Sequence, residues 1–148
     1  MRSHRASTVV FSLLLLAAPA SARQKPDFTG TWVAVSPTEA AGQVQTVKQT
    51  ETTLTRGHGS SGGGHSFTYK FDGTETRINM HGTVTIATAT WDGDKLVMVD
   101  RTTYHDGRHR NAKFVWSLTT QGELVVDFTE QFNGQPATTM RIISRRTP

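Results

Sequence analysis

The chain contains no cysteine. The side chains with the most obvious potential for ligand or metal binding are its arginines and histidines. Arg101 and Arg141 lie in stretches that mix apolar and polar residues. A guanidinium group can hold a carboxylate through two parallel hydrogen bonds. If these stretches are strands around a cavity, either arginine could anchor the acidic head of a small amphipathic ligand, so we name both as candidate ligand-binding residues.

Four apolar residues complete the candidate ligand-binding set. They lie in runs where apolar residues recur at every second position, which places each set on one face of a strand. They could form the wall of an apolar pocket or simply fill a core, and the sequence leaves both interpretations open. The four are Tyr69, Met98, Trp116 and Phe128.

The histidines form two loose pairs. His58 and His65 flank a Gly/Ser-rich stretch, and His105 and His109 flank Asp106-Gly107-Arg108. Two histidines and an aspartate could begin a metal site, but the spacing matches no known ligand motif and there is no cysteine to complete a set. We expect exposed loop histidines, and we predict no metal site and no cofactor.

The sequence gives little support for catalysis or for nucleic-acid binding. It contains no recognisable nucleophile motif and no phosphate-binding loop, so we do not predict an enzyme, although a small barrel enzyme stays an alternative. The formal charge of +4 includes Arg2 and Arg5, and it falls to +2 for residues 23–148. No basic stripe interleaved with aromatic residues is present, and we expect no nucleic-acid partner.

Turn signals divide the chain into short extended segments. Asp-Gly, Gln-Gly and Asn-Gly pairs place turn glycines at 73, 93, 107, 122 and 134, spacings of 12 to 20 residues that leave no room for crossover helices. The sequence therefore predicts an all-β fold, a single up-and-down antiparallel meander of about 8–10 strands. Such a long meander avoids exposed edges by closing into a barrel; a β-sandwich is the structural alternative.

Strand alternation also predicts which residues face the barrel interior. Polar residues interrupt one of these faces, since Leu96 and Met98 share theirs with Asp100 and Thr102. Buried polar groups must be paired or hydrated, so either a cavity or solvent exposure at the strand end would explain them. The expected interior residues are Phe28, Trp32, Phe67, Tyr69, Phe71, Val84, Ile86, Leu96, Met98, Phe114, Trp116, Leu118, Leu124, Val126, Phe128, Met140 and Ile142.

The first 22 residues have the features of a secretory signal peptide. Arg2 and Arg5 precede a short apolar run, and Ala20-Ser21-Ala22 is typical of a cleavage site. We therefore expect residues 1–22 to be removed and residues 23–148 to form one domain in the periplasm or outside the cell. A membrane anchor would need a longer apolar run, and we expect no integral membrane anchor.

The start of the expected mature chain resembles a known signature. Gly30 and Trp32 follow Phe28 at alternate positions, and this pattern is similar to the Gly-x-Trp motif on the first strand of the calycins, which include the lipocalins and fatty-acid-binding proteins. The resemblance implies a lipocalin-like barrel in which a late arginine packs over the tryptophan. By position Arg141 is the best match, with Arg145 second, so Gly30, Trp32 and Arg141 form the expected barrel-closing signature.

Three functions follow as hypotheses. The first is an exported lipocalin-like protein that binds a small, mainly apolar or amphipathic molecule. The second is an interaction protein whose barrel is filled by its own side chains and which acts on an envelope or secreted protein. The third is a small barrel enzyme. A large cavity favours the first, and a filled barrel favours the second.

Overall fold

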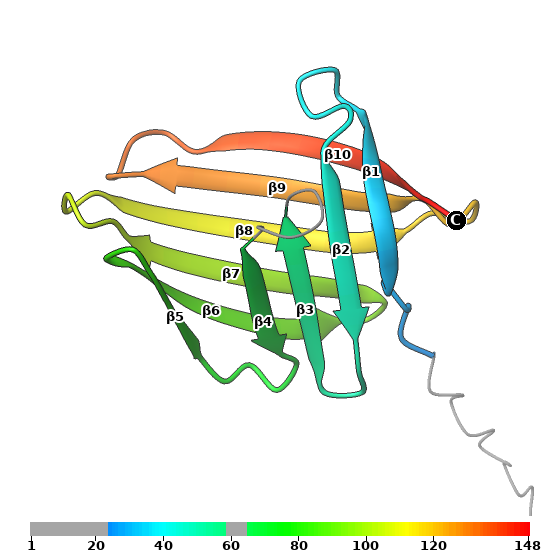
Figure 1. Cartoon of the computed structure of the whole chain (residues 1–148), viewed down its shortest axis with the longest axis horizontal. Helices are drawn as coiled ribbons and strands as arrows, with labels where there is room; N and C mark the ends of the chain where they lie inside the picture. Colours follow the sequence, from blue (N-terminus) through cyan, green and yellow to red (C-terminus); the bar gives the residue numbers. More distant parts are fainter. Residues whose placement is uncertain (1–23, 59–64) are drawn as a thin grey trace, which may run out of the picture.

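A computed structural model describes residues 24–58 and 65–148, and ten strands in this part of the chain form one antiparallel sheet (Figure 1). The expected signal peptide and positions 59–64 of the Gly/Ser-rich stretch lie outside the described residues. Within the described ranges, no helix is long and apolar enough to cross a bilayer. The strands are β1 (Gly30–Ser36), β2 (Val44–Gln49), β3 (Thr53–His58), β4 (Ser66–Lys70), β5 (Thr76–Met80), β6 (Thr83–Asp92), β7 (Lys95–Thr103), β8 (His109–Leu118), β9 (Leu124–Phe132) and β10 (Thr138–Arg146).

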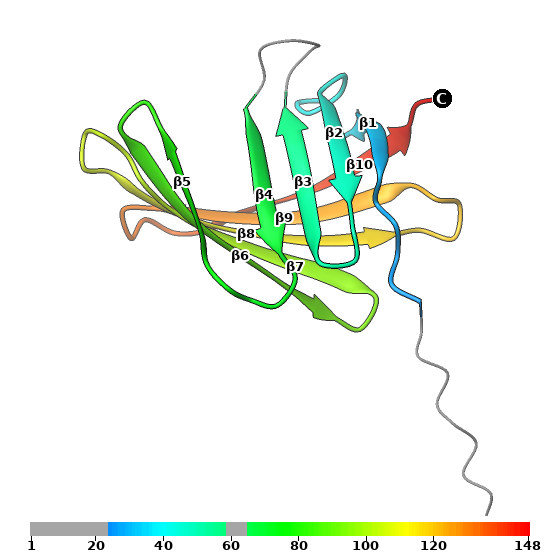
Figure 2. The same cartoon turned by 60° about the horizontal axis from the view of Figure 1, so that its bottom comes forward.

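The sheet closes through its first and last strands. The strand order is β4-β3-β2-β1-β10-β9-β8-β7-β6-β5, so β1 pairs with β10 and the sheet ends at β4 and β5. Figure 2 shows these two edge strands diverging from the turn that joins them. An isolated bridge between Asp72 and Thr90 ties the end of β4 to β6. The predicted up-and-down meander is confirmed, and it forms a nearly closed barrel.

The apolar core fills one end of the barrel. Trp32, Leu96, Met98 and Trp116 have no exposed surface, and they belong to one continuous cluster that extends to Phe28. The ring of Phe28 meets the ring of Trp116 edge to face, with centroids 5.6 Å apart. This packing removes large apolar side chains from water and provides the main stabilisation of this end.

The expected inward position of Val84 and Ile86 is wrong. In the hairpin of β6 and β7, Met98 pairs with Ala89 and Asp100 pairs with Ala87. Directly paired residues of an antiparallel sheet share a face, so the buried side chains of β7 require the alanines to point inward. Val84 and Ile86 are then on the outer face. Met140 lies on the expected inward face, because it pairs with the inward Phe128, but its side chain is 40% exposed.

The first strand is fixed by a contact with the last. Trp32 is fully buried, its indole N–H donates to the Phe28 carbonyl at 2.8 Å, and the Arg146 guanidinium lies 4.7 Å from its ring centroid. Gly30 has a φ of 143°, and a Cβ there would lie 3.2 Å from the Arg146 side chain. Glycine is therefore needed for both the backbone conformation and the close approach.

The arginine over Trp32 is Arg146, which corrects the assignment of this role to Arg141. Arg141 pairs with Asp127 at 2.6 Å, and its side chain is 66% exposed. It lies between Met140 and Ile142, whose partners Phe128 and Val126 face inward, so it points outward. The second choice, Arg145, is also exposed and pairs with Glu123.

Trp32→Ala should lower the free energy of unfolding by about 3–5 kcal/mol, because it removes a fully buried aromatic side chain and leaves a cavity. Urea denaturation followed by circular dichroism measures the change. A near-wild-type unfolding curve would contradict the role of Trp32 in closing the barrel.

Arg146→Ala and Arg141→Ala form a matched pair for the same assay. Arg146→Ala should cost about 1 kcal/mol, because it removes a cation–π contact at a solvent-accessible site. Arg141→Ala should leave the unfolding curve unchanged, since exposed ion pairs contribute little. The reverse order would show that Arg141 is the arginine that closes the barrel.

Candidate functional site

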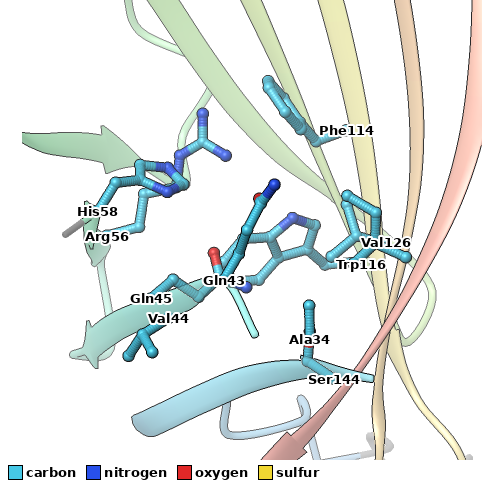
Figure 3. Close-up of a pocket in the computed structure, with 11 residues that line it drawn as sticks. Ala34, Gln43, Val44, Gln45, Arg56, His58, Phe114, Trp116, Val126 and Ser144 are labelled. Carbon is cyan, nitrogen blue, oxygen red and sulfur yellow. The ribbon is translucent and has the colours of Figure 1, made fainter. Parts of the chain in front are cut away.

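The described part of the barrel contains a cavity of about 460 Å³ that is partly open to solvent. A smaller space of about 80 Å³ adjoins it, and both are lined by Gln43, Arg56, His58, Phe114 and Ile142. Figure 3 shows Arg56 and His58 extending from β3 across the interior from Phe114 and Trp116 on β8. The larger cavity is further lined by Phe67, Met80, Thr83, Thr85, Asp100, Thr102, Tyr104, Arg110 and Phe128.

The sequence of β7 explains why the cavity lies beyond the core. The inward side chains of this strand begin with Leu96 and Met98, which are fully buried in the core, and continue with Asp100 and Thr102, which line the cavity. The inward face of β7, which mixes apolar and polar residues in the sequence, therefore lines the apolar core at one end and the polar cavity at the other. Asp100 and Thr102 are only 3% and 7% exposed, so exposure at a strand end does not account for them.

Arg56, Asp100 and Tyr69 form a buried polar cluster in the cavity wall. The Arg56 Nη2 atom lies 3.4 Å from Asp100 Oδ2, and the Tyr69 hydroxyl donates to the same oxygen at 3.0 Å. Burial raises the pKa of Asp100, an effect that Arg56 and the Tyr69 hydrogen bond oppose. Burial also raises the pKa of Tyr69, so its hydroxyl remains a donor at neutral pH.

The guanidinium of Arg56 is surrounded by aromatic rings. It lies 4.1 Å from the Phe114 centroid and 5.5 Å from that of Tyr69. Cation–π contacts with these rings stabilise a charge that has lost most of its water. Two buried atoms of the cluster nevertheless have no hydrogen-bond partner within the described chain, namely Arg56 Nε and Asp100 Oδ1.

A second pair of charges and a pair of hydroxyls extend the polar wall. Arg110 Nε donates to Glu130 Oε2 at 2.8 Å, and its guanidinium lies 5.6 Å from the Phe128 ring centroid. The hydroxyls of Thr85 and Thr102 are 3.0 Å apart and share a hydrogen bond. The cavity therefore combines aromatic surfaces with polar groups that are largely paired to one another.

His58 belongs to the cavity lining and not to a separate loop. It is the last residue of β3, and it remains accessible to solvent. Its partial burial and the neighbouring Arg56 guanidinium lower the pKa of its imidazole to about 4. At neutral pH the ring is uncharged and adds no second positive charge beside Arg56.

The structure brings some of the six candidate ligand-binding residues together and separates others. Phe128 lines the larger cavity and Trp116 the smaller space. Tyr69 is buried and reaches the cavity wall through Asp100, whereas Met98 packs in the core. The assignment of the other two candidates, Arg101 and Arg141, to the ligand site is wrong.

Arg101 and Arg141 lie on the outer surface. The side chain of Arg101 is 56% exposed and pairs with Glu75, just as Arg141 pairs with Asp127. Neighbouring residues of a strand point to opposite faces, so the inward side chain of Asp100 forces Arg101 outward. Neither arginine can anchor a ligand in this cavity.

The charged groups that do line the cavity are Arg56, Asp100 and Arg110. The sequence indicated Asp100 as a polar residue on the face of Leu96 and Met98, but we named none of the three as a ligand-binding residue. The alternation of inward and outward side chains along β3 and β8 already indicates that both arginines face the interior. Arg56 is two residues beyond Leu54 in β3, and Arg110 shares the inward face of Ala112 and Phe114 in β8. Recognising them requires the face of each strand to be known, and the Thr-rich sequence of β3 obscures that face.

The described residues contain no group of three or more His, Asp or Glu side chains arranged to hold a metal ion. His65 and His81, which are distant in the sequence, approach to 6.3 Å between ring centroids. His105 and His109 lie at the other loop named in the sequence analysis, and His109 Nδ1 is 3.2 Å from the Thr103 hydroxyl.

Comparisons with known proteins support the fold. No known family model matches the chain, and no curated protein matches its sequence. Among solved structures, the chain is similar to secretory abundant heat soluble protein 4 from Ramazzottius varieornatus, with a TM-score of 0.51 and 12% sequence identity. The match covers 81% of this chain and 94% of that one. At this identity the likeness shows a shared barrel fold and does not assign the chain to the calycins.

Arg56→Met should lower the free energy of unfolding by about 3–5 kcal/mol at pH 7, because it leaves Asp100 buried and uncompensated. The double variant Arg56→Met with Asp100→Leu should be more stable than Arg56→Met alone, since it removes both charges. Urea denaturation of the wild type, both single variants and the double variant measures the coupling. Additive losses would show that the two side chains do not interact.

The loss in Arg56→Met should also shrink as the pH falls from 8 to 5. The pKa of Asp100 is already raised by burial, and removing the guanidinium raises it further. A carboxyl with a raised pKa in the folded state favours folding when protonated, and this contribution is lost as the pH rises through that pKa. A loss that is constant with pH would contradict the charge-based explanation.

NMR titration of the histidine side chains should give His58 a pKa of about 4. In Arg56→Met the pKa should rise toward the ordinary value for histidine, because the neighbouring positive charge is gone. A wild-type His58 with the ordinary pKa of a histidine would contradict its placement beside Arg56.

Proposed function

We propose that this protein is an exported binding protein whose barrel encloses one small, mainly apolar molecule. The observation that carries the proposal is the cavity of about 460 Å³. Pockets for small molecules have volumes of about 300–1,000 Å³ and combine apolar walls with a few polar groups. Phe67, Phe114, Phe128 and Met80 provide such walls here, and Arg56 and Asp100 provide polar groups.

The same cavity favours binding over the alternative of a barrel filled by its own side chains. The core cluster fills the end built around Trp32 and Trp116, but the side chains of Thr85 and Thr102 are too small to fill the section beyond it. A protein selected only for its outer surface would gain stability from larger apolar side chains at these positions. The proposal assigns no catalytic step to the cavity.

Export is the part of the proposal that rests on the sequence. We infer that residues 1–22 direct the chain out of the cytoplasm, because they combine a basic start, an apolar run and an Ala-x-Ala site. The absence of cysteine is compatible with an oxidising compartment, in which the fold needs no disulfide. Sequencing the N-terminus of the protein recovered from a periplasmic fraction tests this part.

The purified protein should bind the neutral fluorophore N-phenylnaphthylamine saturably, with one molecule per chain. Thr102→Phe should weaken this binding by about tenfold or more, because the larger side chain occupies the cavity. Fluorescence titration gives the affinity, and native mass spectrometry gives the stoichiometry and reveals any co-purified small molecule.

Thr103→Phe is the matched control for Thr102→Phe. Thr103 is the next residue in β7 and is exposed on the outer face, so the same substitution there should leave the affinity unchanged. Equal effects of the two variants, or no saturable binding to the wild type, would contradict a ligand site inside the barrel.

A further inference from the structure

The charges around the cavity are already balanced within the protein. Arg56 pairs with Asp100, and Arg110 pairs with Glu130. His58 is uncharged at neutral pH. Two positive and two negative groups therefore leave no net charge for a ligand to neutralise.

The unpartnered atoms of the inner pair differ in hydrogen-bonding character. Arg56 and Tyr69 both direct their donors to Asp100 Oδ2, which leaves Asp100 Oδ1 as an acceptor without a donor. Arg56 Nε is a donor without an acceptor. The side chains of Arg56 and Asp100 are only 7% and 4% exposed, so bulk solvent does not readily satisfy these atoms, and unsatisfied buried polar atoms are costly.

Resting on the proposed function, we propose that the ligand carries an uncharged polar head with both a hydrogen-bond acceptor and a donor, such as a primary amide or an alcohol. The head lies beside Arg56 and Asp100, with its acceptor toward the guanidinium and its donor toward the carboxylate. The apolar part of the ligand lies against Phe114 and Phe128, which stack with centroids 4.9 Å apart.

A carboxylate head fits this site poorly, although an arginine is present. It would have to displace Asp100 from Arg56 or lie beside it as a second negative charge. Either arrangement leaves one carboxylate without compensation beside the buried side chains of Arg56 and Asp100, which is strongly unfavourable. A cationic head has the opposite problem, because it would compete with Arg56 for Asp100.

Competition among four molecules with the same alkyl chain tests this inference. Octanamide, octanol, octanoate and octylamine would each be titrated against bound N-phenylnaphthylamine at pH 8. We expect octanamide and octanol to displace the fluorophore at concentrations about tenfold or more below those needed for octanoate and octylamine. Stronger displacement by octanoate than by octanamide would overturn the neutral head group while leaving a ligand-binding barrel in place. If the fluorophore itself does not bind, the proposed function and this inference both fail.

Asp100→Asn tests which residues cause the preference. Without the carboxylate charge, Arg56 becomes available to an anion, and octanoate should gain at least about tenfold in affinity relative to octanamide. Asp127→Asn is the matched control, because Asp127 forms a similar pair with Arg141 on the outer face; it should leave the ranking unchanged. An unchanged ranking in folded Asp100→Asn would overturn the placement of the head at this pair. If Asp100→Asn does not fold, the wild-type ranking alone decides.

Discussion

The pairing of β1 with β10 is the constraint on which the rest of the structure depends. It joins strands from opposite ends of the chain and turns an open meander into a nearly closed barrel. Trp32 lies buried on β1, and Arg146 from β10 covers its ring. Gly30 permits this close approach. Without closure, the inward faces of β3, β7 and β8 would not meet, and neither the core nor the cavity would exist.

The barrel interior divides into an apolar part and a polar part. Large apolar side chains fill the end around Trp116, where burial contributes most of the favourable free energy. Beyond them, Arg56 and Asp100 are buried at the expense of their hydration, and a buried ion pair rarely stabilises a protein relative to an apolar core. A function in the cavity gives a reason for these residues that stability alone does not provide.

Much of the fold could be predicted from the sequence, because turn glycines and period-two alternation are local signals. The faces of individual strands were harder to assign. Val84 and Ile86 look like core residues in isolation, yet their pairing through β7 places Ala87 and Ala89 inside. The ligand-binding arginine was assigned wrongly for the same reason. Arg101 directly follows the inward residue Asp100 and therefore points outward, whereas Arg56 points inward from a strand with weak alternation. The arginine over Trp32 could not be chosen by position alone, because it depends on the register of β10 against β1.

The most direct test of the account is to map binding onto the two faces of the barrel by NMR. Chemical shifts would be followed as octanamide is added to the isotope-labelled protein. The account predicts saturable changes at the inward residues Arg56, Asp100 and Phe128, with little change at the outward residues Arg101 and Arg141. Changes confined to the outer face, or no saturable change at inward residues, would contradict a binding function inside the barrel.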